Sequence, residues 1–506
     1  MAELKTEYKN IFKSTFLFGF VQIFNILTKV GLNKAAAVFL GAEGVGLIGI
    51  YQSLIEMLKT FFGLGVSQSA VRDISKANTD GDEKKFSMII TVTNKVVWFT
   101  AILGAIATAI LSPYLSQWSF GNDKYTFVFI IVAVIVLLSI LAEGQLSILK
   151  GMRQLRALAK ASIYGSASGL IAGVPFYYFL GKDGIVPTLF VVALTAVIFS
   201  TYYVRKIKYR KIKYRKIKVS AKETIDESSN MVKMGMALMF VTFLGILSDY
   251  IIKIYISNIS NLDMVGIYQA GATIVSGYFG IIIVAMMTDY YPRISAVYDN
   301  NIQLSEEVDK QSKVGLILIG PLIVVFMFLM PHFITILYSE DFLISVDFVS
   351  YAIFGTIIII CSNPMDMILL AKQKAKVFLL ATVFYRIIGI FISLFSYKYY
   401  GMQGLGISVI IMALIHILLM QGIMYKLYNI RFKLETMYML LITLLITYFA
   451  FLVKDLESLN LRYSTGIFLF LVSIVYSVYN LEKKMEINVI EFIKLRIKKL
   501  GNKHVK

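Results

Sequence analysis

The feature that most constrains this chain is a series of apolar runs about twenty residues long. A helix of about 20 residues rises about 30 Å, the thickness of the hydrocarbon core of a bilayer. Of the 506 residues, 58% are hydrophobic and only 16% are charged, whereas a soluble domain has about 25% charged residues. We therefore expect an all-α membrane protein. The pattern excludes a soluble enzyme, a disordered chain and an outer-membrane barrel, whose strands alternate apolar and polar residues.

The sequence predicts fourteen transmembrane helices. The first apolar run is too long for a signal peptide and lacks a small-residue cleavage site, so we expect it to remain as a spanning helix. The least apolar runs are 46–66 and 232–255, which both contain charged residues. The expected spans are 11–33, 46–66, 87–112, 126–148, 158–180, 184–204, 232–255, 264–288, 314–337, 346–371, 376–397, 403–425, 436–453 and 463–480.

Loop charge predicts the orientation of the chain. The net charge is +19, and the loops on the side of the N-terminus hold 38 Lys and Arg residues against six on the opposite side. Because basic loops stay in the cytoplasm, we expect a multi-pass protein of the cell membrane with both termini cytoplasmic. No outside loop exceeds about a dozen residues, which leaves no room for an extracytoplasmic catalytic domain.

The second six-helix block repeats motifs of the first. Gly49-Ile50-Tyr51-Gln52 at the start of the second span recurs 217 positions later as Gly266-Ile267-Tyr268-Gln269. Two further pairs keep nearly this offset: Ile74-Ser75 with Ile294-Ser295, and Lys95-Val96 with Lys313-Val314. Since six spans separate the copies, both have the same orientation. Two parallel six-helix halves form a transporter architecture that holds its substrate near the membrane midplane.

We therefore expect an N-lobe at 1–204, a basic cytoplasmic linker at 205–230, a C-lobe at 231–425, two further spans within 426–480 and a basic tail at 481–506. The linker repeats the pentad Arg-Lys-Ile-Lys-Tyr. A solvated linker that fixes topology and a segment that adheres to anionic headgroups both fit it, whereas a short loop between two spans does not suit nucleic acid. In the tail, four apolar residues share one helical face, which is typical of an amphipathic interfacial helix.

Ionisable residues inside apolar spans are costly, so they are candidate functional residues. The cations expected to contact the substrate are Lys29, Lys34, Lys59, Lys253 and Arg386. The acidic residues expected to form ion pairs or to couple transport to a cation are Glu56, Asp249 and Asp366. Glu56 with Lys59, and Asp249 with Lys253, are three and four positions apart, so each pair shares a helix face and can be purely structural.

Other ionisable residues have simpler interpretations. His416 is interpreted as a hydrogen-bonded packing residue, and Lys95, Glu143, Lys233 and Asp289 lie near cytoplasmic helix ends, where they can reach water. The single cysteine and three dispersed histidines give neither a disulfide framework nor metal-ligand spacing, and no P-loop is present. We expect no catalytic residue, metal or cofactor. Cations from both halves instead suit a cavity that receives an anion such as phosphate.

Four motifs resemble the O-antigen translocases, the flippases of lipid-linked oligosaccharides in the multidrug/oligosaccharidyl-lipid/polysaccharide exporter superfamily. The motifs are Phe39-Leu40-Gly41-Ala42-Glu43-Gly44-Val45-Gly46-Leu47, Gly65-Val66-Ser67-Gln68, Leu149-Lys150-Gly151-Met152-Arg153 and Tyr291-Pro292-Arg293-Ile294-Ser295. The resemblance covers roughly residues 10–425 and gives weight to Lys34, five residues before the first motif. The chain departs from the family in two extra C-terminal helices, more like the lipid II flippases, and in Gln52-Ser53 at a position where relatives carry a basic residue.

The resemblance implies two six-helix lobes in a V-shaped arrangement that work by alternating access. It implies an undecaprenyl-diphosphate oligosaccharide as substrate, moved from the cytoplasmic to the periplasmic leaflet, and H⁺, Na⁺ or the membrane potential as the energy source. A cation-coupled multidrug exporter of the same superfamily is the alternative, which the basic intramembrane residues disfavour. A membrane polymerase or glycosyltransferase needs larger outside loops, and a scaffold that transports nothing is also compatible with the repeat.

Overall fold

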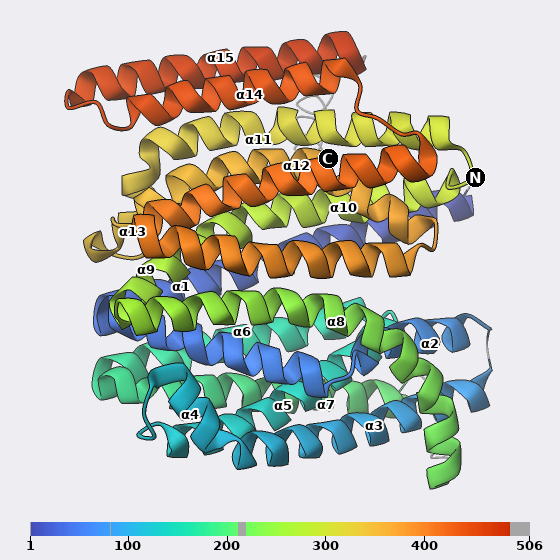
Figure 1. Cartoon of the computed structure of the whole chain (residues 1–506). Coiled ribbons are helices and arrows are strands. Elements are labelled where there is room, and N and C mark those ends of the chain that lie inside the picture. Colours follow the sequence, from blue (N-terminus) through green and yellow to red (C-terminus); the bar gives the residue numbers. More distant parts are fainter. Residues whose placement is uncertain (1, 81, 211–218, 486–506) are drawn as a thin grey trace, which may run out of the picture. The chain divides into compact units, whose positions relative to one another are not determined.

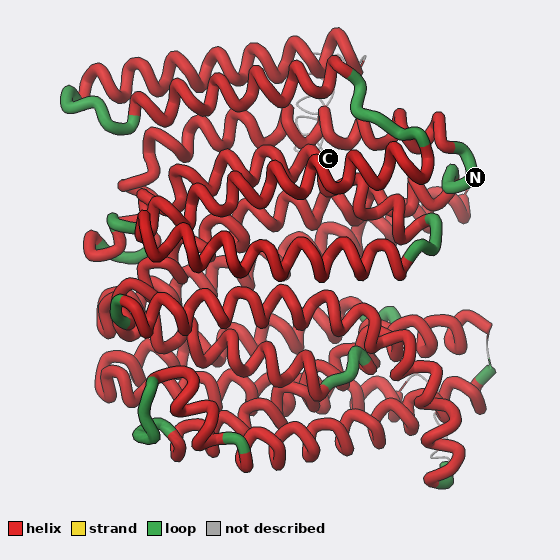
Figure 2. Tube along the Cα trace, viewed as in Figure 1, coloured by secondary structure: helices red, strands yellow, loops and turns green. Residues whose placement is uncertain are grey.

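A computed structural model describes residues 2–80, 82–210 and 219–485, and every regular element in those ranges is helical (Figures 1 and 2). Most of the basic pentad repeat and the predicted tail helix therefore lie outside the described residues. The chain forms two compact units, which we describe separately. The first contains Met1–Gln269 and Leu337–Asp341, and the second contains Ala270–Ile336 and Phe342–Lys506.

The first unit is built around α1, which packs against α5, α6 and α8. Its second half is almost wholly buried, since Ile50 and Leu54 have no exposed surface. The helices of this unit are α1 (Ala2–Phe62), α2 (Val66–Asp80), α3 (Glu83–Ile110), α4 (Ser112–Phe120), α5 (Thr126–Gly151), α6 (Leu155–Leu180), the 3₁₀ turn η1 (Gly181–Gly184), α7 (Ile185–Arg210) and α8 (Ala221–Ile259).

The second unit is built around α12, which packs against α10, α13 and α14. The helix α9 (Leu262–Ala272) begins in the first unit and ends in the second. The other elements are η2 (Thr273–Phe279), which is a π-helix, α10 (Gly280–Ala296), α11 (Asn301–Leu337), the turn η3 (Glu340–Phe342), α12 (Ser345–Ala371), α13 (Ala375–Tyr428), α14 (Leu434–Val453) and α15 (Leu459–Met485). The last two lie side by side (Figure 1).

Eleven of the described helices are long and apolar enough to cross a membrane. Two of them contain a glycine with non-helical dihedral angles, Gly41 (φ 67°) in α1 and Gly401 (φ 55°) in α13. A third apolar stretch, Leu155–Ile207, contains α6 and α7 with Gly181 (φ 57°) between them. Only glycine adopts a positive φ at little cost, so the chain bends at these three points.

Two segments that the sequence predicts as cytoplasmic loops are helical. Val66, Ala70, Ile74 and Ala77 form a buried stripe on α2, which explains why the predicted loop 67–86 is mostly helix. The helix α8 begins at Ala221, well before the predicted span, behind a capping box of Ser220 and Glu223. The hydrogen bond that the backbone N–H of Ser220 donates to Glu223 lowers the pKa of that exposed carboxyl.

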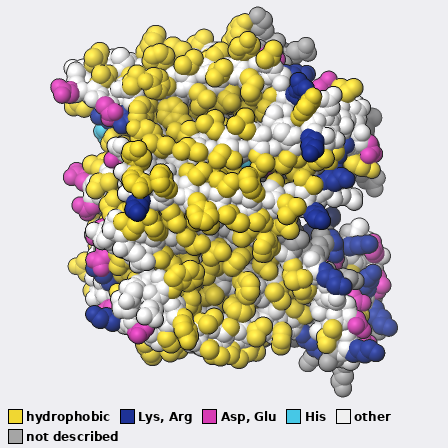
Figure 3. Space-filling model, in the orientation of Figure 1, with side chains coloured by type: hydrophobic (Ala, Val, Ile, Leu, Met, Phe, Trp, Pro, Cys, Tyr) yellow, Lys and Arg dark blue, Asp and Glu magenta, His cyan; other side chains and the backbone are white. Residues whose placement is uncertain are grey.

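The described surface suits a lipid environment. Large apolar side chains such as Phe99, Ile110, Phe179 and Phe391 are more than 60% exposed. On the face shown in Figure 3, hydrophobic side chains cover the helices of each unit, and charged side chains gather near the helix ends. Exposed apolar area of this extent marks a surface that water does not contact, which agrees with the expected multi-pass membrane protein.

Within the first unit, segments from the two predicted lobes come into very close contact. A Cβ atom added to Gly266 of α9 would lie 1.9 Å from the carbonyl oxygen of Ala42, and one added to Gly46 would lie 2.2 Å from that of Leu262. A similar contact joins Gly65, beyond α1, to Gly235 of α8. Small residues allow helix backbones in membranes to approach this closely.

Candidate functional site

Lys253 is a buried cation that lies between α8 and α1. Only 3% of the residue is exposed. Its ammonium group lies 2.6 Å from Asp249 Oδ2 and donates a 2.6 Å hydrogen bond to Ser53 Oγ. Ser53 Oγ also lies 3.0 Å from the same Asp249 oxygen, to which it can donate. The predicted Asp249–Lys253 pair therefore forms, and the hydroxyl of Ser53 ties it to a second helix.

Lys59 lies between two carboxylates. Its Nζ atom is 2.6 Å from Glu56 Oε2, as the spacing predicts, and 3.6 Å from Glu143 Oε2 of α5. The three side chains line a cavity of about 140 Å³ between the end of α1, α5 and α8. The other lining residues are Thr60, Gly63, Gly65, Ser67, Gln68, Ile140, Met239, Thr242 and Ile246. One ammonium and two carboxylates give the lining a formal charge of −1 when all are ionised.

Lys29 and Lys34 both lie on the first half of α1. The side chain of Lys29 is exposed, and that of Lys34 is half-buried. The ammonium of Lys34 donates a hydrogen bond to the carbonyl oxygen of Tyr338, and the neighbouring Asn33 amide lies 3.5 Å from the Tyr338 hydroxyl. Residues 337–341 belong to the first unit, so this contact joins α1 to the segment that follows α11.

Asp366 and His416 lie in the second unit, where they form one polar cluster with Ser362 and Tyr385, and Arg386 follows Tyr385 on α13. His416 Nε2 lies 3.3 Å from Asp366 Oδ2, and His416 Nδ1 lies 2.7 Å from Ser362 Oγ. The ring of Tyr385 packs edge-on against the imidazole, with centroids 5.2 Å apart. The guanidinium of Arg386 lies 5.9 Å from the centre of the Tyr385 ring, and its buried Nε makes no hydrogen bond within the described residues.

The structure thus places the predicted site residues in separate groups. Lys29, Lys34, the Glu56–Lys59 pair and the Asp249–Lys253 pair belong to the first unit, and Arg386 and Asp366 belong to the second. Glu143, Ser53, Ser362 and Tyr385 complete these groups and were not predicted as site residues. Ser53, Glu143 and Ser362 each contact a residue of another helix, and Tyr385 contacts His416 from the other arm of α13. The spacing of residues in the sequence therefore does not predict these contacts. Among the described residues, no group of three or more His, Cys, Asp or Glu side chains is arranged to hold a metal.

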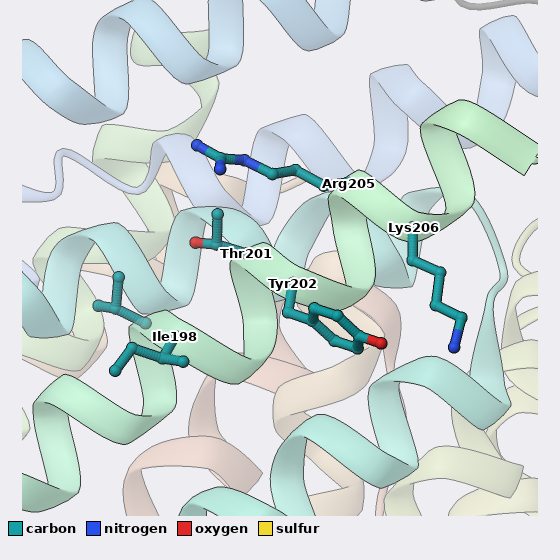
Figure 4. Close-up of a pocket in the computed structure, with 6 residues that line it drawn as sticks. Ile198, Thr201, Tyr202, Arg205 and Lys206 are labelled. Carbon is teal, nitrogen blue, oxygen red and sulfur yellow. The ribbon is translucent and has the colours of Figure 1, made fainter.

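A larger recess of about 600 Å³ lies at the cytoplasmic end predicted for α7. Its described lining residues, Val197, Ile198, Thr201, Tyr202, Arg205 and Lys206, all come from this one helix (Figure 4). The ammonium of Lys206 lies 5.5 Å from the centre of the Tyr202 ring. Aromatic and basic side chains of this kind are typical of helix ends at the membrane–water interface, which agrees with the predicted position of this end of α7.

Comparison with known proteins identifies a family model and two curated relatives that match this chain. The family model described as "Polysaccharide biosynthesis protein" matches residues 11–298. The Lipid III flippase of Escherichia coli (strain K12) is 21% identical over 367 residues, which cover 71% of this chain and 85% of that protein. The Lipid III flippase of Shigella flexneri matches with the same figures.

Two solved structures share the fold. The lipid II flippase MurJ in an inward closed conformation superposes with a TM-score of 0.69 at 14% identity, covering 94% of this chain and 100% of that one. An inward-facing multidrug resistance MATE family transporter of the MOP superfamily gives a TM-score of 0.67 at 14% identity, covering 80% of this chain and 96% of that one. At such low identity, these likenesses establish the fold alone.

Proposed function

The chain belongs to the polysaccharide biosynthesis protein family, whose model matches more than half of it, and from this premise we propose that it is a flippase for lipid-linked oligosaccharides. The substrate is an undecaprenyl-diphosphate carrying an O-antigen or a related surface polysaccharide repeat unit. It passes from the cytoplasmic to the periplasmic leaflet of the inner membrane. The observation that carries the proposal is the presence of basic side chains inside the apolar helices of a member of this family.

The charge of the substrate explains why those cations are needed. A diphosphate left unpaired in a low-dielectric cavity would cost far more than the net stability of a protein. Lysine and arginine compensate such an anion through charge-assisted hydrogen bonds. We assign Lys29, Lys34, Lys59, Lys253 and Arg386 to this role. Because the two predicted lobes both contribute cations, the anion keeps a partner as the lobes rock in alternating access.

The pairing of Lys59 and Lys253 implies an exchange of partners. In this structure each ammonium is held by a carboxylate of its own helix. A lysine that contacts the diphosphate must first weaken that pair, and H⁺ or Na⁺ bound at Glu56 or Asp249 would do so by neutralising the carboxylate. This links entry of a coupling cation to release of a substrate-binding cation.

The bends at Gly41, Gly181 and Gly401 support fourteen crossings. If each of the three bent stretches crosses the membrane twice, the eleven apolar helices become the fourteen predicted spans. We propose two six-helix lobes, two appended C-terminal helices and two cytoplasmic termini. The basic recess on α7 and the linker beyond it would then face the anionic lipids of the cytoplasmic leaflet.

A cation-coupled multidrug exporter is the second candidate. The cavity beside Lys59 favours it, because its lining holds two carboxylates and one ammonium and so suits a cationic ligand. Cellular lipid analysis separates the two candidates. In a host whose own flippase gene is deleted, expression of this chain should restore surface glycan and remove the lipid-linked precursor that accumulates at the cytoplasmic leaflet. Drug resistance without any change in the precursor would support the exporter instead.

A further inference from the structure

The polar cluster around His416 contains a histidine whose two ring nitrogens both have partners. Nε2 faces Asp366 Oδ2 at 3.3 Å, and Nδ1 faces Ser362 Oγ at 2.7 Å. Ser362 Oγ also lies 3.3 Å from the carbonyl oxygen of Ile359. The serine hydroxyl therefore has two alternatives, to donate to the imidazole or to donate to its own helix.

This arrangement satisfies both protonation states of the imidazole. In the neutral state, Nε2–H donates to Asp366 and Nδ1 accepts the Ser362 hydroxyl proton. When a proton binds at Nδ1, the new N–H donates to Ser362 Oγ, and the hydroxyl turns to donate to the Ile359 carbonyl. Neither state leaves a ring nitrogen without a partner, so one proton can enter or leave without the cost of an unsatisfied buried polar group.

The position of the cluster makes such a proton significant. His416 is 8% exposed, and the cluster joins α12 to both arms of the bent helix α13. Pro364 lies between Ser362 and Asp366 and has no N–H to donate to the preceding turn, which makes a helix easier to distort at that point. A change of charge in the cluster therefore affects the contacts among three predicted spans. It does so next to Pro364, where α12 lacks a backbone hydrogen bond.

The charged neighbours determine what the proton does. The ring of Tyr385 of α13 packs against the imidazole. Arg386, the next residue of α13, and Asp366 both act electrostatically on the Tyr385 hydroxyl. The charged residues of the other helices that pack against α12 contact groups outside this cluster. Arg293 of α10 pairs with Asp289 and Glu307, and Glu435 of α14 pairs with Lys313. The buried Asp309 of α11, which also packs on α12, accepts hydrogen bonds from the Thr436 hydroxyl and the Lys433 backbone N–H. The carboxylate that contacts His416 is therefore Asp366.

We propose that His416 and Asp366 form a proton-binding site that couples transport to the proton gradient. Binding one proton raises the formal charge of the cluster by one. The imidazolium adds a positive charge at the point where α12 meets both arms of α13, so proton binding changes the electrostatic interactions between these helices. The coupling rests on the proposed flippase function, whereas the proton site rests only on the geometry of the second unit.

The proton site is tested by nuclear magnetic resonance on the full chain in lipid nanodiscs, with histidine labelled by ¹³C. The sequence has only three histidines, so the His416 signal is identified by its loss in His416→Gln. If the site binds a proton, the signal should change with pH within the range from about pH 5 to 8, where histidines in proteins commonly exchange a proton. The pH dependence should differ in Asp366→Asn, because that substitution removes the carboxylate that faces Nε2. A His416 signal that stays constant across this range, or that titrates identically in Asp366→Asn, would overturn the proposal.

The coupling is tested in proteoliposomes with a synthetic undecaprenyl-diphosphate oligosaccharide as the probe. A gradient of one pH unit corresponds to a factor of about ten per coupled proton, so the leaflet distribution of the probe should shift by about tenfold in wild type. His416→Gln and Asp366→Asn should show no shift. His332→Gln, a control outside the cluster that alters a hydrogen bond to Tyr463, should keep it.

The two readouts distinguish the possible failures. A wild type that moves no probe, while the His416 signal still titrates, contradicts the flippase proposal and leaves the proton site standing. A His416→Gln protein that moves the probe with the full dependence on the gradient contradicts the coupling and leaves the flippase function standing.

Discussion

At the scale of single residues, the intramembrane charges form pairs and small networks. The spacing of Glu56 with Lys59 and of Asp249 with Lys253 predicts two ion pairs, and both form. The contacts of Ser53 with Lys253 and of Glu143 with Lys59 are not predicted, because they join helices that are distant in the chain. His416, expected to be a hydrogen-bonded packing residue, is hydrogen-bonded to Ser362. It also faces Asp366, and this contact could not be predicted because the two residues lie on different helices.

The buried Asp249–Lys253 pair predicts a specific pattern of stability. Asp249→Asn leaves the buried Lys253 ammonium without its carboxylate, which typically costs about 3–5 kcal/mol in stability. The double variant Asp249→Asn/Lys253→Gln should recover most of this loss, since an amide pair leaves no unpaired charge. Thermal unfolding of the purified protein in detergent measures both effects.

The matched control is the exposed Lys182–Glu43 pair, whose side chains are 46% and 41% exposed. Lys182→Gln should change stability by at most about 1 kcal/mol, as is usual for surface pairs. An Asp249→Asn protein as stable as this control would show that the buried pair does not hold α8 to α1. A double variant that is stable but exports no glycan would show that the pair takes part in transport as well as in holding the helices.

At the scale of elements, the apolar runs predict the positions of the long apolar helices well, whereas the connections are harder to predict. Hydropathy predicts only whether a segment is surrounded by lipid or by the protein core. It therefore predicts neither the polar helix α2 nor the π-helical geometry of η2. The bends at Gly41 and Gly401 depend on positive φ angles, and glycines elsewhere in apolar runs of the same composition stay helical. The repeat anchor Gly266-Ile267-Tyr268-Gln269 has a role that appears only in three dimensions, where Gly266 packs on Ala42.

That contact predicts that Gly266→Ala is strongly destabilising. The added Cβ would lie 1.9 Å from the backbone carbonyl of Ala42, so α9 and α1 must separate, and overpacking of this kind typically costs about 1–3 kcal/mol or more. Gly422→Ala in α13 is the control, because nothing lies within 4 Å of its added Cβ and alanine favours a helix. Thermal unfolding should show a lower midpoint for Gly266→Ala only, and equal midpoints would refute the close packing.

At the scale of the whole molecule, the charge asymmetry of the loops is the strongest information in the sequence. It predicts a complete topology because Lys and Arg are enriched in short cytoplasmic loops, so the charge of each loop predicts its side of the membrane. The chain divides into two compact units whose boundaries differ from those of the predicted lobes. The first unit extends to Gln269 and includes Leu337–Asp341. Contacts between segments far apart in the chain produce that division, and no local pattern encodes them.

The predicted topology is tested by reporter fusions. Fusions at Lys124, Lys182, Glu340 and Lys398 should report the periplasm, and fusions at Lys76, Lys208 and Lys374 should report the cytoplasm. The fusion at Lys398 is the most informative, because it lies just before the bend at Gly401. A cytoplasmic signal there, or a periplasmic C-terminus, would contradict fourteen crossings.

The most direct test of the cationic pathway measures translocation of an undecaprenyl-diphosphate oligosaccharide in proteoliposomes by variants of Lys34 and Arg386. Arg386→Lys should retain partial activity, because it keeps the charge and loses the planar guanidinium. Lys34→Ala, Arg386→Ala and the double variant should be almost inactive with normal membrane insertion, since the diphosphate would then lack a cation. Translocation at the wild-type rate by the double alanine variant would show that the anion crosses elsewhere, and the cationic pathway would be wrong.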